Sequence, residues 1–469
     1  MKAILERRWV ARCAPALIAL AVGLSGCAGV GPQPMSAAPA VLQQASVAAQ
    51  LPAGALAAAD RPNLAWRDWV REPRLMQWVE LALQNNRDLR VALLNVQRAQ
   101  AQLGLADANR LPTLGVGLNA GRAPNYKGVE TNGLSAGLQV SAWEVDLYGR
   151  LASLSDAARA QLLATEAGRH AVSVSLVAAV VQAGLALQAD GELLTLARQS
   201  LASREQTLTL TQLRESVGAA SQLELQAQQT LAAQARAALA QLLRQQAQDG
   251  HALSLLLGQP LPASLDSARP GLADETWLAE VPVGLSSAVL LRRPDVIAAE
   301  QTMRAAQANI VAARAAFWPT ISLTAQAGQA SSQLSGLLQG GTFVYSIAAN
   351  ALLTVFDSGR RQANVELAQV AQQIAQAQYE RAIQSAFRDT ADALVGLATW
   401  RDQLAAQREQ RDAARETARL TELKASQGAA SVLERLDAQR ALWAAEQSVV
   451  QVRLAELANR VALYKALGG

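Results

Sequence analysis

Residues 210–221 read LTQLRESVGAAS, and residues 420–431 read LTELKASQGAAS. The two stretches lie 210 positions apart and are identical at eight of twelve positions. A repeat of so long a period indicates two copies of one structural unit, which decides the fold class before any other feature. Each copy has a Gly-Ala-Ala-Ser turn at its centre.

The repeat extends along most of the chain. The segment DLYGR at 146–150 is echoed by FDSGR at 356–360 with the same offset, and LPT at 111–113 is echoed by WPT at 318–320 with an offset of 207. We therefore predict a first structural repeat over 73–265 and a second over 266–469.

The first 26 residues have the pattern of a secretory leader. Basic residues precede an apolar stretch at 14–24, which is too short to span a bilayer. The stretch ends in Leu-Ser-Gly-Cys, which resembles a bacterial lipobox with Cys27 as the acylated residue. Ala28 follows instead of Asp, which in the lipoproteins that this chain resembles implies sorting to the outer membrane. We expect a signal peptide over 1–26 and a covalent lipid on Cys27.

Removal of the leader changes the charge and the cysteine content. The leader carries four basic residues and one glutamate, so the formal net charge falls from +4 to +1. Such a balance gives no argument for nucleic-acid binding. Cys27 is then the one cysteine left, which excludes a disulfide within the chain. Residues 27–72, rich in Ala, Pro and Gln, are expected to form an extended N-terminal arm.

Four segments alternate apolar residues with small or polar ones. This pattern predicts strands at about 113–121, 134–147, 320–329 and 343–356. In the second segment the apolar residues change parity at Trp143, which predicts a β-bulge. Amphipathic strands usually face a protein core. Here the opposite faces carry Gly, Ser, Thr, Gln and Asn, which favours a water-filled lumen on one side and lipid on the other.

Two long helical patterns follow the strand pairs, at 149–217 and 359–427. Each predicts a helix, or a stacked pair of helices, of ~100 Å. The glycine turns reverse the chain and give hairpins over 149–257 and 359–467. The second return helix carries a coiled-coil-like apolar stripe. Residues 172–187 are apolar enough for a transmembrane helix, but their polar interruptions favour a buried layer between helices.

The strand count constrains the assembly. In lipid every backbone group must be paired, so an open four-stranded sheet cannot span a membrane. Three copies would give a closed barrel of twelve strands with cyclic symmetry. The fold class is therefore mainly α with membrane β, as a homotrimeric 12-stranded β-barrel continued by a periplasmic α-helical barrel.

Five motifs carry a resemblance to a known family. They are WEVDLYGR at 143–150, LRRPDV at 291–296, FWPTISL at 317–323, FDSGR at 356–360, and the two Gly-Ala-Ala-Ser turns. In order and spacing they resemble the TolC-like outer-membrane efflux proteins, in their NodT-type lipoprotein branch, over essentially the whole mature chain. One departure is Asn-Arg-Asp at 86–88 where the second copy has Arg-Pro-Asp at 293–295, which we expect at a strand-to-helix join.

The resemblance implies a function without chemistry. Such proteins are homotrimeric conduits through the outer membrane and periplasm. They dock a periplasmic adaptor protein and an inner-membrane pump, and they pass drugs or other small molecules outward.

The hairpin turns are the expected docking site for the adaptor. We assign this role to two sets of residues, Val217, Gly218, Ala219 and Ala220 in the first tip and Gln427, Gly428, Ala429 and Ala430 in the second. Gly218 and Gly428 are also expected to supply the positive φ that a chain reversal needs.

The two copies differ beside the tips, where Gln212 corresponds to Glu422. A threefold ring of acidic residues at a constriction would repel itself and bind cations, so Glu422 and Gln212 are candidate gate residues. A solvated surface charge explains Glu422 equally well.

No catalytic or metal site is expected. His170 and His251 lie far apart without metal-ligand spacing, and no nucleophile elbow, phosphate loop or paired-carboxylate motif is present. The only expected modification is the lipid on Cys27. A lipid-anchored periplasmic coiled-coil scaffold is the rival function, but it leaves the amphipathic strands unexplained. A pump adaptor would carry one hairpin between β-rich halves instead of two copies.

Overall fold

A computed structural model describes residues 65–124, 128, 130–261, 272, 277–280, 287–338 and 343–469. All of them belong to one compact unit, Val47–Gly469. The predicted signal peptide, Cys27 and most of the N-terminal arm lie outside the described residues.

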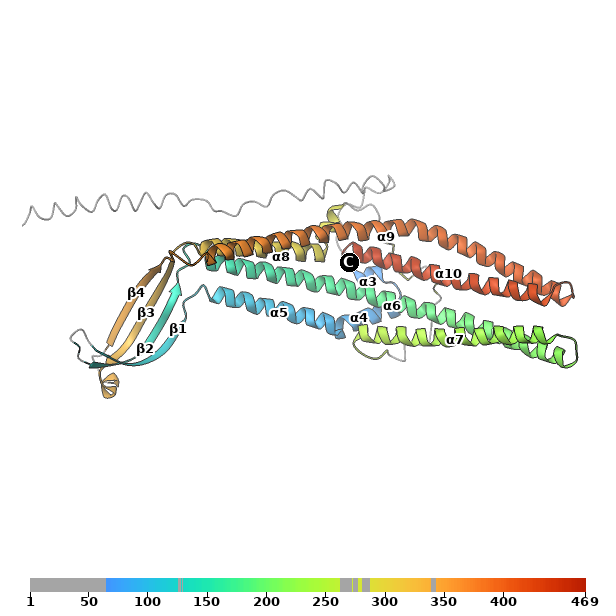
Figure 1. Cartoon of the computed structure of the whole chain (residues 1–469), viewed down its shortest axis with the longest axis horizontal. Helices are drawn as coiled ribbons and strands as arrows, with labels where there is room; N and C mark the ends of the chain where they lie inside the picture. Colours follow the sequence, from blue (N-terminus) through green and yellow to red (C-terminus); the bar gives the residue numbers. More distant parts are fainter. Residues whose placement is uncertain are drawn as a thin grey trace, which may run out of the picture. The chain divides into compact units, whose positions relative to one another are not determined.

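Four antiparallel strands form one sheet in the order β1-β2-β3-β4 (Figure 1). The strands are β1 (Leu114–Pro124), β2 (Glu130–Glu144), β3 (Thr320–Ser331) and β4 (Phe343–Leu352). The prediction of β4 to residue 356 was too long. Leu352 pairs with Thr320, the first residue of β3, so later residues have no partner strand. The prediction for β2 started too late, because Glu130 already pairs with Pro124.

The predicted bulge in β2 is confirmed. The register against β3 shifts between Val140 and Trp143, and Ala142 has a positive φ of 46°. The Trp143 indole Nε1 donates a hydrogen bond to the Arg110 carbonyl at 3.1 Å. The bulge therefore turns the indole toward the segment that enters β1.

Two very long helices follow the strand pairs. α6 (Arg150–Ser216) and α9 (Arg360–Ser426) each run for 67 residues. Both are single helices and not stacked pairs. The return helices are α7 (Gln222–Leu257) and α10 (Val432–Ala466).

Shorter helices complete each repeat. α4 (Pro73–Asn85) and α5 (Arg87–Ala108) precede β1, whereas η3 (Ser287–Arg292) and α8 (Pro294–Ala315) precede β3. Asn86 separates α4 from α5, because its extended backbone, with a ψ of 131°, interrupts the helix. A short 3-10 helix, η4 (Leu334–Leu338), follows β3.

The described end of the N-terminal arm contains a helical turn instead of being extended throughout, and it buries Trp69 and Val70. α3 (Trp66–Trp69) is one helical turn. Trp69 is fully buried and stacks on Tyr464 of α10, with ring centroids 4.0 Å apart. Val70 forms an antiparallel bridge with Leu278. The arm is therefore anchored to the end of the second repeat.

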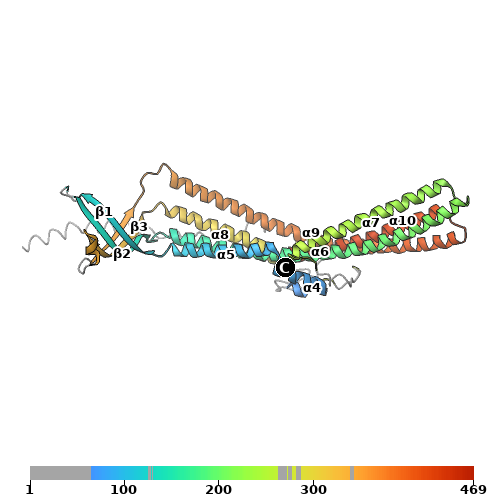
Figure 2. The same cartoon turned by 90° about the horizontal axis from the view of Figure 1, so that it is seen from below.

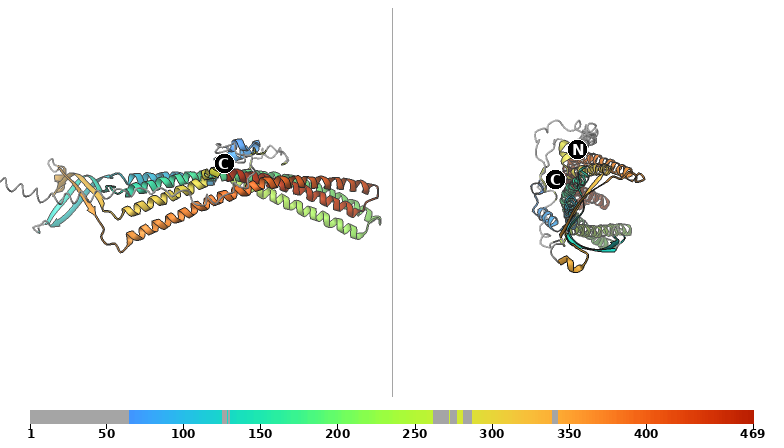
Figure 3. Two further views of the ribbon diagram at one scale, coloured as in Figure 1. Left: turned by 90° about the horizontal axis from the view of Figure 1, so that it is seen from above. Right: turned by 90° about the vertical axis from the view of Figure 1, so that its left-hand side faces the viewer.

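The helices pack side by side in two successive rows. Near the sheet, α6 packs between α5 and α8, and α8 packs on α9. Beyond these short helices, α6 packs between α7 and α10, and α10 packs on α9 (Figures 2 and 3). α5 and α9 end the first row, while α7 and α9 end the second.

The main apolar core lies in the middle of α6. Within this helix Val177, Val180, Val181 and Leu185 are at most 2% exposed and pack in one cluster with α4, α7 and α10. By length and composition α6 could cross a membrane, and it is the one such helix among the described residues. Its apolar segment is nevertheless a buried layer between helices, as the sequence predicted.

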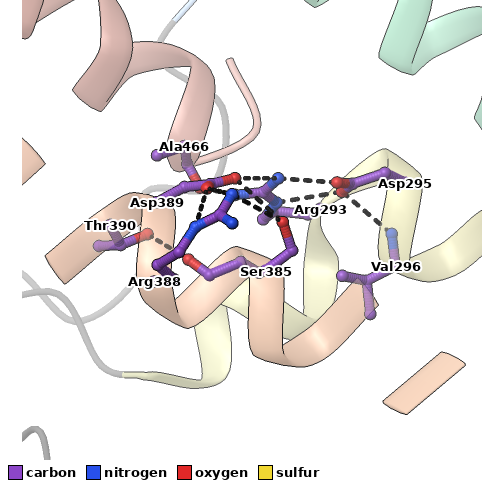
Figure 4. Close-up of polar contacts among 9 residues, drawn as sticks. Arg293, Asp295, Val296, Ser385, Arg388, Asp389, Thr390 and Ala466 are labelled. Atoms are coloured by element: carbon purple, nitrogen blue, oxygen red, sulfur yellow. Dashed lines mark hydrogen bonds and ion pairs between the residues drawn. The ribbon is translucent and has the colours of Figure 1, made fainter. Parts of the chain in front are cut away.

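A polar joint ties the start of the second repeat to its end (Figure 4). The buried Arg293 donates through Nη1 to the Ala466 carbonyl at 2.9 Å and through Nε and Nη2 to Asp295 at 3.0 and 2.7 Å. Its Nη2 also lies 3.6 Å from Asp389 of α9. One guanidinium thus connects α8, α9 and α10.

The first repeat has an equivalent joint with different chemistry. Asn86 donates through Nδ2 to the Leu256 carbonyl at 2.9 Å, and its Oδ1 caps α5 by accepting from Leu89 N. Leu256 and Ala466 are equivalent at the 210-residue offset. The prediction that this motif lies at a strand-to-helix join is wrong, because it joins α4 to α5 in one copy and η3 to α8 in the other.

Candidate functional site

One face of the sheet is apolar and exposed. Val116, Leu138, Ala327 and Tyr345 form a row across the four strands, and Val116 and Tyr345 are 78% and 75% exposed. The same face continues with exposed apolar residues, namely Leu114, Leu118 and Ile347. A contiguous apolar face of this kind on a sheet has the pattern of a lipid-facing barrel surface.

The other face is made of small and polar residues. Gly117, Gly137, Gly328 and Val344 form the neighbouring row across the strands. At Gly137 an added Cβ would lie 2.4 Å from the Ala327 carbonyl oxygen, so only glycine permits this backbone approach. The next row contains Gln139, Gln326 and Ser346, which would present hydrogen-bonding groups to a water-filled lumen.

Both edges of the sheet are open in the described chain. β1 pairs only with β2, and β4 pairs only with β3. An open strand edge presents unpaired N–H and C=O groups, which lipid cannot satisfy. The sheet is therefore incomplete as a membrane-spanning structure.

The two hairpin tips have the same backbone geometry. Gly218 and Gly428 adopt φ values of 75° and 74°, which confirms the predicted left-handed turns. In the first tip Gly218 N donates to the Glu215 carbonyl and Ala219 N to the Arg214 carbonyl. The second tip repeats both bonds at equivalent residues, so each long helix ends in a Schellman motif.

The serine of each turn caps the return helix. Ser221 Oγ accepts from Glu224 N, and Ser431 Oγ accepts from Glu434 N, both at 3.1 Å. Glu434 also accepts from the Ser431 backbone, which completes a capping box. The Gly-Ala-Ala-Ser signature therefore encodes the helix stop, the reversal and the next helix start.

The tips lie at the end of the helices away from the sheet (Figures 1 and 2). Exposed apolar side chains lie near them in both hairpins. Leu210, Leu213 and Leu223 are more than half exposed. Their equivalents in the second tip are also exposed, namely Leu420, Leu423 and Leu433. The residues predicted from the sequence for docking are those of the turns, and these flanking leucines, which recur at the 210-residue offset, add an exposed apolar surface beside them.

The gate candidates are both exposed near the tips. Gln212 lies on α6 and Glu422 on α9, at equivalent positions. Glu422 Oε1 lies 3.6 Å from Arg435 Nη1 of α10, so the acid already has a basic partner within the hairpin. The structure thus places Glu422 between its two helices, and its gating role stays a prediction.

The described part of the chain holds no cluster of metal-ligating side chains. No three His, Cys, Asp or Glu residues group there closely enough to hold a metal ion. His170 and His251 are both exposed.

Comparison with known proteins places this architecture in one family. The model of the outer membrane efflux protein family matches residues 78–259 and 285–469. The chain is 39% identical to the probable efflux pump outer membrane protein TtgC of Pseudomonas putida, over 91% of this chain and 90% of TtgC. It is 36% identical to the cation efflux system protein CusC of Escherichia coli, over 96% of this chain and 97% of CusC.

Solved structures agree with the sequence relatives. A membrane protein from Pseudomonas aeruginosa superposes with a TM-score of 0.82 at 36% identity, covering 90% of this chain and 95% of that one. The open state of the MtrE outer membrane channel of Neisseria gonorrhoeae gives a TM-score of 0.78 at 35% identity, covering 86% and 91%. The duplicated strand-and-hairpin architecture is thus that of outer membrane channels, and the chain belongs to the outer membrane efflux protein family.

Proposed function

We propose that three copies of this chain assemble into the passive outer membrane conduit of a tripartite efflux system. The observation that carries the proposal is the four-stranded sheet with two open edges and an exposed apolar face. Edge-to-edge pairing of copies would satisfy the open backbone groups of β1 and β4 and place the apolar face in lipid.

The number three follows from barrel size. Two copies would give eight strands, and the interior of an eight-stranded barrel is just wide enough to be filled by side chains. Three copies give twelve strands, which leaves room for a lumen lined by the glycine, glutamine and serine rows. Cyclic symmetry closes such an assembly from one chain type.

The helical rows support the same closure. At the open edges, α5 exposes Val91, Leu94 and Leu105, and α9 exposes Leu367, Val370 and Ile374. These apolar side chains lie on the two helices that end the row near the sheet. Packing α5 of one copy on α9 of the next would bury both sets and continue the barrel into the periplasm.

Two neighbouring residues of β4 test the assignment of the faces. Ile347→Lys places a charge on the proposed lipid face, at a cost of about 2–4 kcal/mol in a bilayer. Its neighbour Ser346 lies on the proposed lumen face and serves as the control. We expect I347K to abolish membrane-inserted trimer, measured by mass in detergent and by heat-modifiable mobility. S346K should keep the trimer and alter ion selectivity in planar bilayers, and equal behaviour of the two variants would contradict the proposal.

We propose that the hairpin tips dock the periplasmic adaptor, through the exposed leucines around each Gly-Ala-Ala-Ser turn. The double variant L223D/L433D should lose adaptor binding in pull-down while retaining trimer mass and bilayer conductance. Leu255 is 79% exposed and lies at the other end of α7, so L255D is the matched control. Retained adaptor binding by the tip variant would contradict the docking role.

We propose that Glu422 contributes to the resting gate through its ion pair with Arg435. Glu422→Ala should raise the leak conductance in planar bilayers, because it releases α9 from α10 near the tip. Gln212→Ala at the equivalent neutral position should change the conductance less. If the conductance of the Glu422 variant is unchanged, Glu422 is only a solvated surface charge and has no gating role.

We propose a lipid anchor on Cys27 and efflux of drugs or other small organic molecules. The anchor is tested by intact-mass measurement of the purified protein, with Cys27→Ser as the unmodified control. A channel should remain in the outer membrane after C27S, whereas a lipid-anchored scaffold would be released without detergent.

The proposed cargo, drugs or other small organic molecules, is supported by the names of relatives that include antibiotic and toluene efflux. The susceptibility of a deletion strain to such compounds tests this proposal.

A further inference from the structure

A cavity of about 410 Å³ lies among α6, α9 and α10. This volume falls within the range of small-molecule sites in proteins. The cavity begins at residue 408 of α9, almost 50 residues into that helix, so it lies ~70 Å along the helix from the sheet. A lipid headgroup of the membrane that the sheet spans cannot reach it.

The cavity has an excess of positive charge. Its lining includes four arginines, which are Arg408, Arg411, Arg415 and Arg453, and two glutamates, which are Glu192 and Glu446. The first three arginines follow the spacing i, i+3 and i+7, so they lie on one face of α9.

Both glutamates already have partners. Glu446 accepts from Arg415 at 3.0 Å, and Glu192 accepts from the backbone N–H of Leu272. Arg453, which is 4% exposed, donates to the Leu272 carbonyl at 2.9 Å and is paired with Glu456. These contacts fix the acids and two arginines, Arg415 and Arg453, in the wall of the cavity.

The remaining arginines keep uncompensated charge. Arg408 has no ion pair within the described ranges of the chain. Arg411 pairs with its neighbour Asp412 at 2.8 Å, but that carboxylate is 58% exposed, and such a surface pair contributes little. The guanidinium of Arg408 can therefore bind an oxyanion with bidentate hydrogen bonds. Arg411 can add a donor, because its Nε and Nη2 share one oxygen of the exposed Asp412 and leave Nη1 for a ligand.

The rest of the wall combines aliphatic residues with three polar ones of α6, Gln188, Thr195 and Gln199. Leu196 of α6, Val449 and Val450 of α10, and Leu272 contribute aliphatic surface. A cavity with a cationic side and an aliphatic side is complementary to an anion that carries an apolar body.

We propose that this cavity is a binding site for small amphiphilic organic anions, with the carboxylate or sulfonate on Arg408 and Arg411 and the apolar body against the valines and leucines. The site is distinct from transit through the conduit, and all of its lining residues belong to one chain. The first repeat has no equivalent site, because its counterparts of Arg411, Arg415 and Arg453 are Leu201, Glu205 and Leu243. Arg198, the counterpart of Arg408, is an exposed arginine and provides a matched control.

The test is calorimetric titration of the full-length protein in zwitterionic nanodiscs with octanoate and, as its neutral analogue, 1-octanol. We expect saturable octanoate binding at one site per chain and at least about tenfold weaker binding of octanol, since hydrogen bonds to charged groups carry the difference. The double variant R408Q/R411Q should lose at least about tenfold in octanoate affinity, whereas R198Q should bind as the wild type does. Equal binding of acid and alcohol, or equal effects of the two variants, would overturn the site.

A measurement on the wild-type protein tests the proposal even if the double variant misfolds. Raising the ionic strength from about 0.01 M to about 1 M shortens the Debye length from ~30 to ~3 Å. We expect octanoate affinity to fall over this range while octanol binding does not. Salt-independent octanoate binding would also overturn the proposal.

Discussion

The two repeats place the same kinds of contact at equivalent positions but build them from different residues. In the first hairpin Glu205 of α6 pairs with Arg236 of α7 at 3.0 Å. In the second hairpin Arg415 of α9 pairs with Glu446 of α10, also at 3.0 Å. At the 210-residue offset Glu205 corresponds to Arg415 and Arg236 corresponds to Glu446, so the two helices exchange the signs of their charges. After duplication the geometry of helix pairing persisted, while the residues that realise it diverged.

The joints at the start of each repeat differ in the same way. Asn86 and Arg293 each reach the carbonyl near the end of their own return helix. Only the arginine also binds two carboxylates, Asp295 and Asp389. The position equivalent to Asp389 in the first repeat is Ala179. The second repeat therefore concentrates more of its stability in one side chain, and substitutions can measure that difference.

The largest effect is expected at the arginine joint. Arg293→Ala removes a buried cation and leaves Asp295 and the Ala466 carbonyl without the guanidinium, while Asp389 keeps its pair with Arg388, at a cost of about 3 kcal/mol. Asn86→Ala removes a cap and one hydrogen bond, at about 1–2 kcal/mol. Thermal denaturation of the detergent-purified protein measures both. Arg292→Ala, at an exposed neighbour, is the control, and an Arg293 variant no weaker than the Asn86 variant would contradict the comparison.

Alanine substitution of the glycines that end the two return helices should also reduce the stability of the protein by unequal amounts. Gly258 and Gly468 both have positive φ, at 69° and 96°. An added Cβ would lie 2.4 Å from the Asn85 carbonyl oxygen at Gly258, but 3.4 Å from Pro294 at Gly468. Gly258→Ala should cost about 3 kcal/mol from strain plus collision, and Gly468→Ala about 1 kcal/mol from strain alone. Equal losses in denaturation temperature would show that the close approach at Asn85 relaxes freely.

An acid pair distinguishes the first hairpin from the second. Burial, together with a hydrogen bond to Asp249 of α7, raises the pKa of Asp190 to about 7. The equivalent residues in the second repeat are Trp400 and Asn459. The folded state therefore holds a proton on Asp190 that the unfolded chain, with an ordinary pKa of 3.8, releases earlier. The free energy of unfolding should fall as the pH rises from about 4 to about 7.

Asp190→Asn tests this pH dependence. The amide cannot ionise, so the variant should be more stable than the wild type by about 1 kcal/mol at pH 8, with the gain disappearing near pH 4. Denaturation temperatures across that range measure the effect. Asp402→Asn, at an exposed acid of the second hairpin, is the control. If the stability difference between the Asp190 variant and the wild type did not change with pH, the folded protein would not hold the extra proton on Asp190.

The smallest effect is expected from exchanging the reversed ion pair. E205R alone should lose at most about 1 kcal/mol, because it places two cations together on an exposed surface. The double variant E205R/R236E adopts the polarity of the second hairpin and should recover wild-type stability to within about 0.5 kcal/mol. Failure of the second change to recover the loss would show that the polarity, and not only the position, is fixed in each hairpin.

Features that depend on near neighbours could be predicted from the sequence. The left-handed glycines, the bulge at Trp143 and the paired hairpins follow from residues within a few positions of one another. The bond from the Asn86 amide to the Leu256 carbonyl could not be predicted, because that partner lies 170 residues away. The overlong prediction for β4 has the same cause, since only pairing with Thr320 sets where the strand ends.

The sequence by itself determined the duplicated plan, the amphipathic strands and the tip turns, because periodicity and turn chemistry are local properties of the chain. The tertiary structure decided which helix faces meet. It brought Arg293 to Ala466 and Asp389, and it gathered the arginines of α9 and Arg453 of α10 around one cavity with α6. Such sites combine residues from distant segments, whose packing depends on the shapes and charges of whole helix faces and not on any short motif.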